Sequence, residues 1–181
     1  GDEAVPDIDD QTDAFRDAVD GDADPNALHI FSFGATDVHD LVPNETQWAT
    51  RATAEARLAD CADEYVEEIL QLIDIGAQHI LVTGVPDIGI QPIFNGTPEE
   101  AARRAIATEY SNLLDQMVRD RIDALNLPDG VEIHYVSWDA MQGQVIGTMA
   151  GLYGAGSIYP LEDSDLVFFD QVHPTAQVHA L

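Results

Sequence analysis

The chain has 181 residues and is 45% hydrophobic, which is enough apolar material for one domain with its own core. Its 34 acidic residues stand against seven basic ones, all of them arginine, and the formal net charge is −27. Because such a surface repels phosphate groups, nucleic acids and anionic membranes are disfavoured as partners.

The first 24 residues are acidic and lack the basic and then apolar pattern of a signal peptide. After them, three segments have the short apolar run and the flanks of a buried strand, at 28–33, 79–85 and 131–138. No run of about eighteen apolar residues occurs that would predict a transmembrane helix. The sequence therefore predicts three strands and gives no targeting signal from which a compartment can be read.

The segments between the predicted strands have the periodicity of helices. The first ends near Gly76, a typical C-cap, and its length predicts one long helix or two helices joined near Ala59. Its apolar stripe consists of Leu58, Tyr65, Ile69, Leu72 and Ile73. In the second segment, Thr97, Pro98 and Glu100 predict a helix start with a capping box. Its stripe consists of Ile106, Tyr110, Leu113, Met117 and Leu125.

This alternation of strands and helices, with connections too long for hairpins, predicts a parallel sheet with helices on its faces. We expect one α/β domain over residues 1–181, with three strands supplied by this chain. In such sheets ligands bind beyond the carboxyl ends of the strands. The loops that begin at Gly34, Gly84 and Trp138 are therefore the places to look for a site.

The loop after the first strand reads SFGATDVHD, at 32–40. Gly34 lets the backbone approach a ligand closely and offers its N–H as a donor, while Thr36 and Asp37 add polar side chains. A simple turn into the next helix explains the same residues. Both interpretations stay open at this point.

The loop after the second strand reads VTGVPDIGIQPIFNG, at 82–96. Its two prolines and three glycines predict a long, shaped loop, which either forms a wall of a binding site or is a surface excursion. Asp87 follows Pro86 and is either a functional acid or a structural residue of a turn.

The chain ends in FFDQVHPTAQVHAL, where Asp170 lies three residues before His173. A carboxylate that holds one imidazole nitrogen lets the other accept a proton from a hydroxyl, as in the base half of a serine-hydrolase triad. An isolated Asp-x-x-His also occurs by chance. A metal site is not predicted, because His39 and Asp40 lie far away in sequence and no third ligand has a suitable spacing.

The order of three blocks, FSFGATD, VPDIGIQP and FFDQVHPTAQVHAL, resembles the GDSL or SGNH family of serine esterases and lipases, closest to its bacterial lipase and phospholipase branch, which includes autotransporter esterases. The run YSNLL at 110–114 is also similar to the family. The resemblance implies a three-layer, flavodoxin-like fold, of which three strands make only a part.

The resemblance also implies roles for individual residues. Asp170 corresponds to the triad acid and His173 to the general base, and Gly34 provides an N–H of the oxyanion hole. Thr36 stands where the family has an oxyanion-hole asparagine. Losing one such donor typically costs about 10² to 10³ in turnover, although a threonine hydroxyl can still donate.

The implied substrate-binding loop contains Pro86 and Asp87. The implied reaction is hydrolysis of a small ester or a lipid without a metal or an organic cofactor, in a secreted or cell-surface protein, which is an inference from family alone.

The family's nucleophile lies in a Gly-Asp-Ser block, and this sequence has no such block. None of its serines has that context, and Ser32 is expected inside the first strand. The serines are Ser32, Ser111, Ser137, Ser157 and Ser164. We therefore expect this polypeptide alone to have no esterase activity.

Three interpretations follow. In the first, the chain is the C-terminal part of an SGNH esterase, and a complementing N-terminal segment or a second chain lies beside strand 28–33. In the second, it is a catalytically inactive SGNH-like homologue that binds a ligand or a partner. In the third, it is an unrelated flavodoxin-like binding module.

Two features of the composition bear on environment. The excess of Asp over Glu and the absence of lysine are typical of a surface that stays hydrated in high salt, so a halophilic or marine source is one hypothesis and a high-GC composition bias is the other. Cys61 is the single cysteine, which excludes an internal disulfide, and we expect a buried small side chain rather than a reactive thiol.

Overall fold

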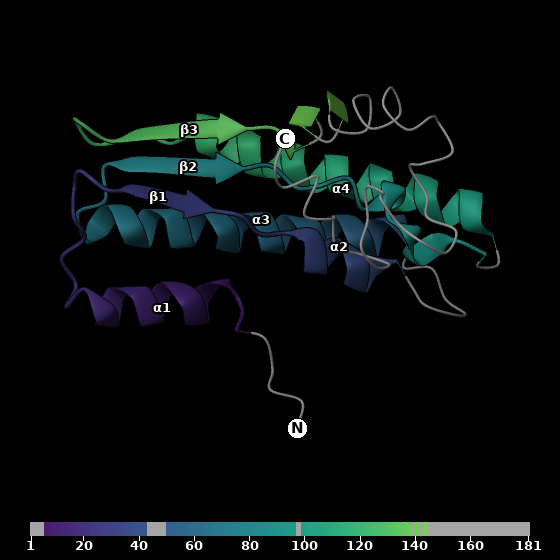
Figure 1. Cartoon of the computed structure of the whole chain (residues 1–181), viewed down its shortest axis with the longest axis horizontal. Coiled ribbons are helices and arrows are strands. Elements are labelled where there is room, and N and C mark those ends of the chain that lie inside the picture. The colour runs from purple at the N-terminus through teal and green to yellow at the C-terminus, as the bar shows by residue number, and fades with distance from the viewer. Residues whose placement is uncertain (1–5, 43–49, 97–98, 139, 142, 145–181) are drawn as a thin grey trace.

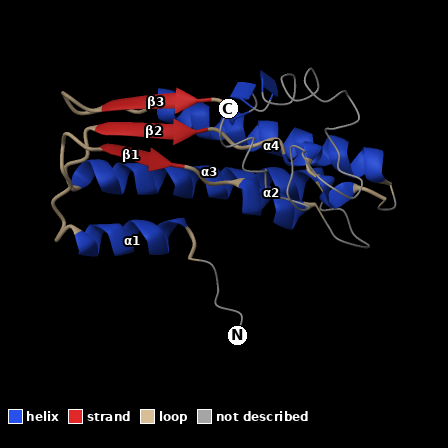
Figure 2. Cartoon of the chain, in the orientation of Figure 1, coloured by secondary structure: helices blue, strands red, loops and turns tan. Residues whose placement is uncertain are grey.

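The computed structural model of the chain describes residues 6–42, 50–96, 99–138, 140–141 and 143–144. Helices, strands and two short 3-10 helices alternate along these residues (Figures 1 and 2). In chain order they are α1 (Ile8–Ala18), β1 (Leu28–Phe31), α2 (Ala35–Leu41), α3 (Arg51–Asp74), β2 (His79–Thr83), η1 (Ile88–Ile90), η2 (Pro92–Phe94), α4 (Glu100–Asp123) and β3 (Glu132–Val136).

The strands form one parallel sheet in the order β1-β2-β3. Its register aligns Leu28 with His79 and His79 with Glu132, so the carboxyl ends of the strands meet at one edge of the sheet. At this end of the sheet, the Thr83 hydroxyl of β2 donates a hydrogen bond to the Phe31 carbonyl of β1 at 3.1 Å. The predicted α/β class with a three-stranded parallel sheet is confirmed.

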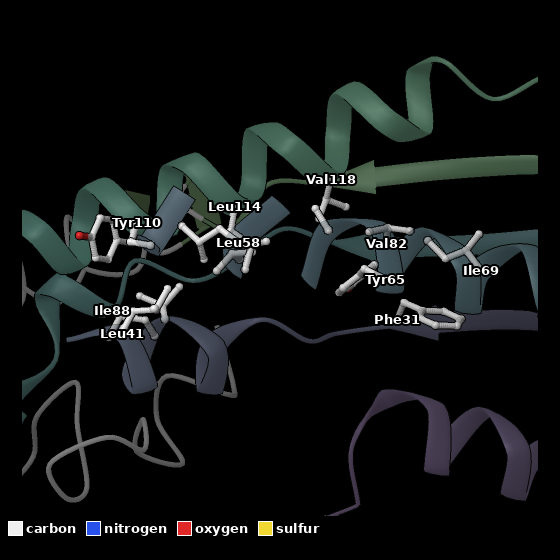
Figure 3. Close-up of a cluster of buried hydrophobic side chains, with 14 of the residues drawn as sticks. Phe31, Leu41, Leu58, Tyr65, Ile69, Val82, Ile88, Tyr110, Leu114 and Val118 are labelled. Atoms are coloured by element: carbon white, nitrogen blue, oxygen red, sulfur yellow. The ribbon is translucent and has the colours of Figure 1, made fainter. Parts of the chain in front are cut away.

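Helices α3 and α4 pack against each other and cover one face of the sheet (Figure 1). That face presents Phe31, Ile80 and Val82, all buried, and Phe31 contacts the ring of Tyr65 on α3. Figure 3 shows this core continuing between α3 and α4 through the labelled side chains of Leu58, Leu114 and Val118. The core therefore lies between the sheet and the helix pair.

The opposite face of β1 is open, because Leu28 is 56% exposed and Ile30 is 60% exposed. Strand β1 is also the edge of the sheet that the described residues form. Helix α1 packs on α3 on the β1 side, where Phe15 meets the ring of His29. A cavity of about 310 Å³ remains between α1 and β1.

Helix α3 is one continuous helix rather than two joined near Ala59. It begins at Arg51, where the Thr50 hydroxyl accepts from the Thr53 N–H, and it ends at Asp74. The predicted stop at Gly76 agrees with its φ of +108°, and the Gly76 N–H donates to the Ile73 carbonyl at 3.0 Å.

Helix α4 begins at Glu100, later than the capping box predicted, and Thr97 and Pro98 lie outside the described residues. The Glu100 carboxylate accepts from the Gly96 N–H at 2.9 Å. The predicted apolar stripe is only partly correct, because Tyr110 is buried whereas Ile106, Leu113 and Met117 are half-buried. The fully buried apolar positions are Ala107, Tyr110, Leu114 and Val118. No helix among the described residues is long and apolar enough to span a membrane.

Candidate active site

The chain leaves β1 through a tight turn whose geometry depends on Gly34. Strand β1 ends at Phe31, so Ser32 lies after the strand and is exposed, contrary to its predicted place inside it. Gly34 has a φ of +97°, and its carbonyl accepts from Val38 in the first turn of α2. A Cβ at Gly34 would lie 3.0 Å from Cγ2 of Val85 and 3.1 Å from Cδ2 of Leu114. The backbone at this point therefore packs directly on the loop after β2 and on α4.

A cavity of about 500 Å³ opens at this end of β1. Both predicted oxyanion-hole residues, Gly34 and Thr36, line it. Among the described residues, neither the Gly34 N–H nor the Thr36 hydroxyl has a hydrogen-bond partner. The cavity is also lined by Pro6, Asp7, Ile8, Gln11, Ser32, Phe33, Ala35, Asp37, Cys61, Glu64, Tyr65 and Leu114. The structure thus joins the predicted donors to a space that can hold a ligand.

The predicted acid and base, Asp170 and His173, lie outside the described residues. Their roles, and the oxyanion-hole roles of Gly34 and Thr36, stay predictions.

The loop after β2 is held by a partly buried carboxylate on α4. Oδ1 of Asp115 accepts from the Val85 N–H at 3.0 Å and from the Tyr135 hydroxyl of β3. Oδ2 of Asp115 pairs with Arg119 at 3.0 Å, and the guanidinium of Arg119 lies over the Tyr135 ring. Burial, and then the hydrogen bond to Asp115, raise the pKa of Tyr135. A side chain at Gly84 would overlap the Asp115 carboxylate, so a glycine is required there.

The rest of this loop also packs on α4 and is not a surface excursion. The Ile88 N–H donates to the Ser111 hydroxyl at 3.1 Å, and Ile88 and Phe94 are buried. The Arg104 side chain donates to the Gly89 carbonyl at 2.7 Å and to the Gln91 carbonyl at 3.0 Å. The loop is therefore an ordered part of the core.

Asp87 caps the first 3-10 helix of this loop. Its Oδ1 accepts from the Gly89 N–H at 2.8 Å and from the Thr108 hydroxyl of α4 at 2.7 Å. Neither Pro86 nor Asp87 lines the cavity that contains Gly34 and Thr36. Of the predicted site residues in the described chain, Gly34 and Thr36 line this cavity, and Pro86 and Asp87 do not. The role of Pro86 and Asp87 in binding a substrate stays a prediction.

The residues that sequence reasoning missed come from the helices. Cys61, Glu64 and Tyr65 of α3 line the cavity, and they fall on one helical face because they are spaced by three and four residues. That spacing was visible in the sequence, but nothing in it indicated that this face meets the exit of β1. Asp115 had no local sequence signal either, apart from its place directly after YSNLL.

Cys61 is not arranged as a nucleophile. Its thiol is half-buried and donates to Oδ1 of Asp37 at 3.3 Å. Burial raises the pKa of Cys61 to about 12, and the Asp37 carboxylate adds to the shift. The thiol is therefore protonated at neutral pH, in keeping with the expectation of an unreactive cysteine.

His39 does not take part in a metal site within the described chain. It is partly buried, and this burial lowers its pKa. No group of three or more His, Cys, Asp or Glu side chains among the described residues is arranged to hold a metal ion.

Comparison with known proteins gave a family and a relative. The family model described as GDSL-like lipase/acylhydrolase matches residues 3–181. A protein of Pseudomonas putida, described as an uncharacterized protein in the trpE-trpG intergenic region, is 30% identical over 170 residues. The match covers 84% of this chain and 27% of the relative, so the chain spans about a quarter of the length of that protein.

Proposed function

The chain belongs to the GDSL-like lipase/acylhydrolase family, whose members are hydrolases of the SGNH type, and from this premise we propose that it takes part in the hydrolysis of carboxylic esters by a serine nucleophile. In this proposal the chain supplies the acid, the base and part of the oxyanion hole. The observation that carries it is the cavity of about 500 Å³ lined by Gly34 and Thr36, whose donors have no partner among the described residues.

The reaction would proceed through an acyl-enzyme. His173, oriented by Asp170, removes the proton of a serine hydroxyl as its oxygen attacks the ester carbonyl. The oxyanion that develops on the substrate accepts hydrogen bonds from the Gly34 N–H and the Thr36 hydroxyl. His173 then passes the proton to the leaving alcohol, and a water molecule, activated by the same imidazole, releases the acyl group.

The serine would come from a segment beside β1. Strand β1 is an edge of the described sheet, its outer face exposes Leu28 and Ile30, and a cavity of about 310 Å³ separates it from α1. An exposed apolar edge strand is a place where another strand pairs. We propose that a complementing N-terminal segment or a second chain occupies this edge and brings the nucleophile to the cavity at Gly34.

The first test is hydrolysis of p-nitrophenyl acetate by the purified 181-residue chain. We expect no activity above the uncatalysed rate, because no serine in the chain lies in a Gly-Asp-Ser block. A version extended by a segment that carries such a block is expected to hydrolyse the ester, and His173→Ala in that version to lower kcat by about 10⁴-fold or more. Steady hydrolysis by the chain alone, abolished by His173→Ala, would contradict the proposal.

The alternative is an inactive SGNH-like homologue that binds a ligand or a partner. Two departures favour it, namely threonine at position 36 in place of asparagine and the missing Gly-Asp-Ser block. A fluorophosphonate reagent separates the two, since it labels only an activated serine. Labelling of the extended version that disappears with His173→Ala supports the hydrolase, and absence of labelling in a folded extended version supports the inactive homologue.

A further inference from the structure

The cavity at Gly34 has a wall of carboxylates that come from three helical segments. Asp7 precedes α1 as its N-cap, Asp37 lies in the first turn of α2, and Glu64 lies in the middle of α3. All of them line the cavity, and neither lysine nor arginine does. The cavity is therefore acidic on the side to which α1, α2 and α3 contribute these residues.

These carboxylates are not neutralised by neighbouring cations within the described chain. Glu64 has no hydrogen-bond or ion-pair partner there, and Asp37 accepts only from the weak thiol donor of Cys61. Asp7 accepts from the Asp10 N–H, which carries no net charge. Burial raises the pKa of Glu64, and the like charges of Asp9, Asp37, Asp7 and Glu67 add to it, as a field of uncompensated negative charge requires.

One cation whose charge acts on a residue of the cavity is Arg57, which lies one helical turn before Cys61 on α3. Its charge lowers the pKa of Cys61, but this effect is the smallest of those that act on the thiol. Arg57 is exposed and does not line the cavity. It moderates the negative field without removing it.

The remaining wall is aromatic and apolar. The rings of Phe33 and Tyr65 meet edge to face with centroids 6.0 Å apart, and Leu114 completes this side. Tyr65 is 5% exposed, and its buried hydroxyl has no acceptor among the described residues. A buried hydroxyl whose proton has no acceptor is costly in a folded protein, and an acceptor oxygen of a ligand that came within reach of it would be stabilising.

The combination of carboxylates and aromatic rings in one cavity favours organic cations as ligands. Carboxylates with aromatic rings in the same cavity bind substituted ammonium groups, which lose little solvation and gain from the ring faces. A bare metal ion is not favoured, because these carboxylates are spread along the wall and do not form a cluster arranged to hold a metal ion. The volume of about 500 Å³ accommodates a small organic molecule.

We propose that this cavity binds an organic cation, so that the ester taken at Gly34 carries a substituted ammonium group that lies against Asp37 and Glu64. The assignment of the cation as part of the substrate rests on the proposed ester hydrolysis, whereas its binding in the cavity does not. An ester with an anionic head group is excluded from the cavity by the same charges.

The test measures how tightly acetylcholine and its uncharged carbon isostere, 3,3-dimethylbutyl acetate, bind to the 181-residue chain. Binding is monitored through changes in the NMR chemical shifts of backbone amides. The two probes have nearly the same shape, and thus a difference in affinity reports the charge. We expect acetylcholine to bind at least about fivefold more tightly, with shifts at Gly34 and Tyr65. Raising the salt concentration is expected to reduce this preference because it screens the carboxylates.

Substitutions of single carboxylates test which of them cause the preference for acetylcholine over its isostere. Glu64→Gln is expected to weaken acetylcholine binding about two- to fivefold, the usual size for a partly exposed charge pair, and to leave the isostere unchanged. Asp37→Asn combined with Glu64→Gln is expected to remove the preference. Asp74→Asn, which removes one carboxylate from the far end of the same helix, is the matched control and is expected to change neither affinity.

The outcomes are distinct from those of the esterase test. Equal affinity for the two probes, no binding of either, or an equal loss in Asp74→Asn and Glu64→Gln overturns the cation site, whatever the enzyme activity. A cation preference that depends on Glu64, in an extended version that hydrolyses no ester, leaves the cation site standing and overturns the proposed hydrolysis.

Discussion

Gly34 is the residue on which the geometry of the candidate site depends most directly. Its φ of +97° suits glycine, and the space where a Cβ would stand is already occupied by Val85 and Leu114. Two physical reasons therefore require a glycine at this position, one in the backbone and one in the packing. The sequence allowed two interpretations of Gly34, a turn residue or a donor toward a ligand. The two are compatible, because the turn leaves the Gly34 N–H without a partner among the described residues.

Replacing Gly34 with alanine is expected to lower the free energy of unfolding by about 2 to 4 kcal/mol, from the left-handed backbone and from overpacking against Val85. Gly21→Ala is the control, since Gly21 has a φ of +72° but nothing within 4 Å of its Cβ position. It is expected to cost about 1 kcal/mol. Urea denaturation of both variants measures the difference, and equal losses would show that packing at Gly34 contributes nothing.

Glu68 on α3 is a second residue whose chemistry the fold changes. It is 3% exposed and faces α1; its Oε1 accepts from Gln71 at 2.6 Å, whereas Oε2 has no partner among the described residues. Burial raises the pKa of Glu68, a hydrogen bond from the Thr12 side chain opposes this shift, and the charges of Asp9 and Asp13 add to it. A carboxyl whose pKa is raised in the native state binds its proton more tightly than in the unfolded chain, so stability falls as pH rises through the range above 4.5.

Glu68→Gln keeps the shape and removes the charge. At pH 7 the variant is expected to be more stable than the parent chain by up to about 1 kcal/mol, and at pH 4.5 this gain is expected to shrink. Glu67→Gln, on the exposed side of the same helix, is the control. Urea denaturation at both pH values checks this, and a variant that loses stability at pH 7 would contradict it.

At the scale of elements, β1 combines a well-packed face with an open one. Phe31 is buried against α3, whereas Leu28 and Ile30 on the other face are more than half exposed. An exposed apolar edge strand pairs readily with other chains. We therefore expect β1 to be the strand through which isolated chains associate with each other, and the same strand to which a further segment would bind in competition with that association.

Ile30→Lys is expected to reduce self-association of the isolated chain while changing the free energy of unfolding by less than about 0.5 kcal/mol, since the position is exposed. Phe31→Ala, one residue further on the buried face, is expected to cost about 3 to 5 kcal/mol. Sedimentation velocity measures the first effect and urea denaturation the second. If Ile30→Lys also costs several kcal/mol, another part of the chain covers this face in solution.

Helix α4 illustrates why an element can be predicted while its orientation is not. Its length and approximate start were predicted from the periodicity and from the capping box that begins at Thr97, but its buried side includes Ala107, Ser111 and Leu114. The cause is the loop after β2, whose Ile88 N–H donates to Ser111 and whose Asp87 accepts from Thr108. A helix that packs against both a sheet and a loop buries small and polar residues that no apolar stripe reveals.

At the scale of the whole molecule, charge dominates. Seven basic residues cannot neutralise 34 acidic ones, although ion pairs are present at Arg16, Arg51, Arg104, Arg119 and Arg121. The molecule therefore carries a strong self-repulsion that salt screens. Salt is the variable that separates a halophilic surface from a plain composition bias.

We expect the melting temperature to rise by about 5 °C or more between 0.1 and 2 M KCl if the surface is halophilic, which corresponds to about 2 kcal/mol for a chain of this size. The physical reason is that screening weakens repulsion among carboxylates. Differential scanning calorimetry measures the shift, with sucrose in place of KCl as a control for excluded-volume effects. A melting temperature unchanged by salt would favour the composition bias.

The sequence by itself determined the α/β class, the places of the three strands, their parallel pairing and the family. Each of these depends on local periodicity or on blocks of adjacent residues, such as FSFGATD and VPDIGIQP. It also named Gly34 and Thr36, which do line a common cavity.

Only the tertiary structure decided that Asp115 accepts from the Val85 N–H and that Asp87 accepts from Thr108 and does not line the cavity. It also decided that α3 contributes Glu64 to the acidic wall of that cavity. The physical reason is that these contacts join side chains far apart in sequence, and their partners are chosen by how helices pack on the sheet. Periodicity states which face of a helix is apolar, but the opposing surface determines which polar groups on that helix become buried, paired or free to meet a ligand.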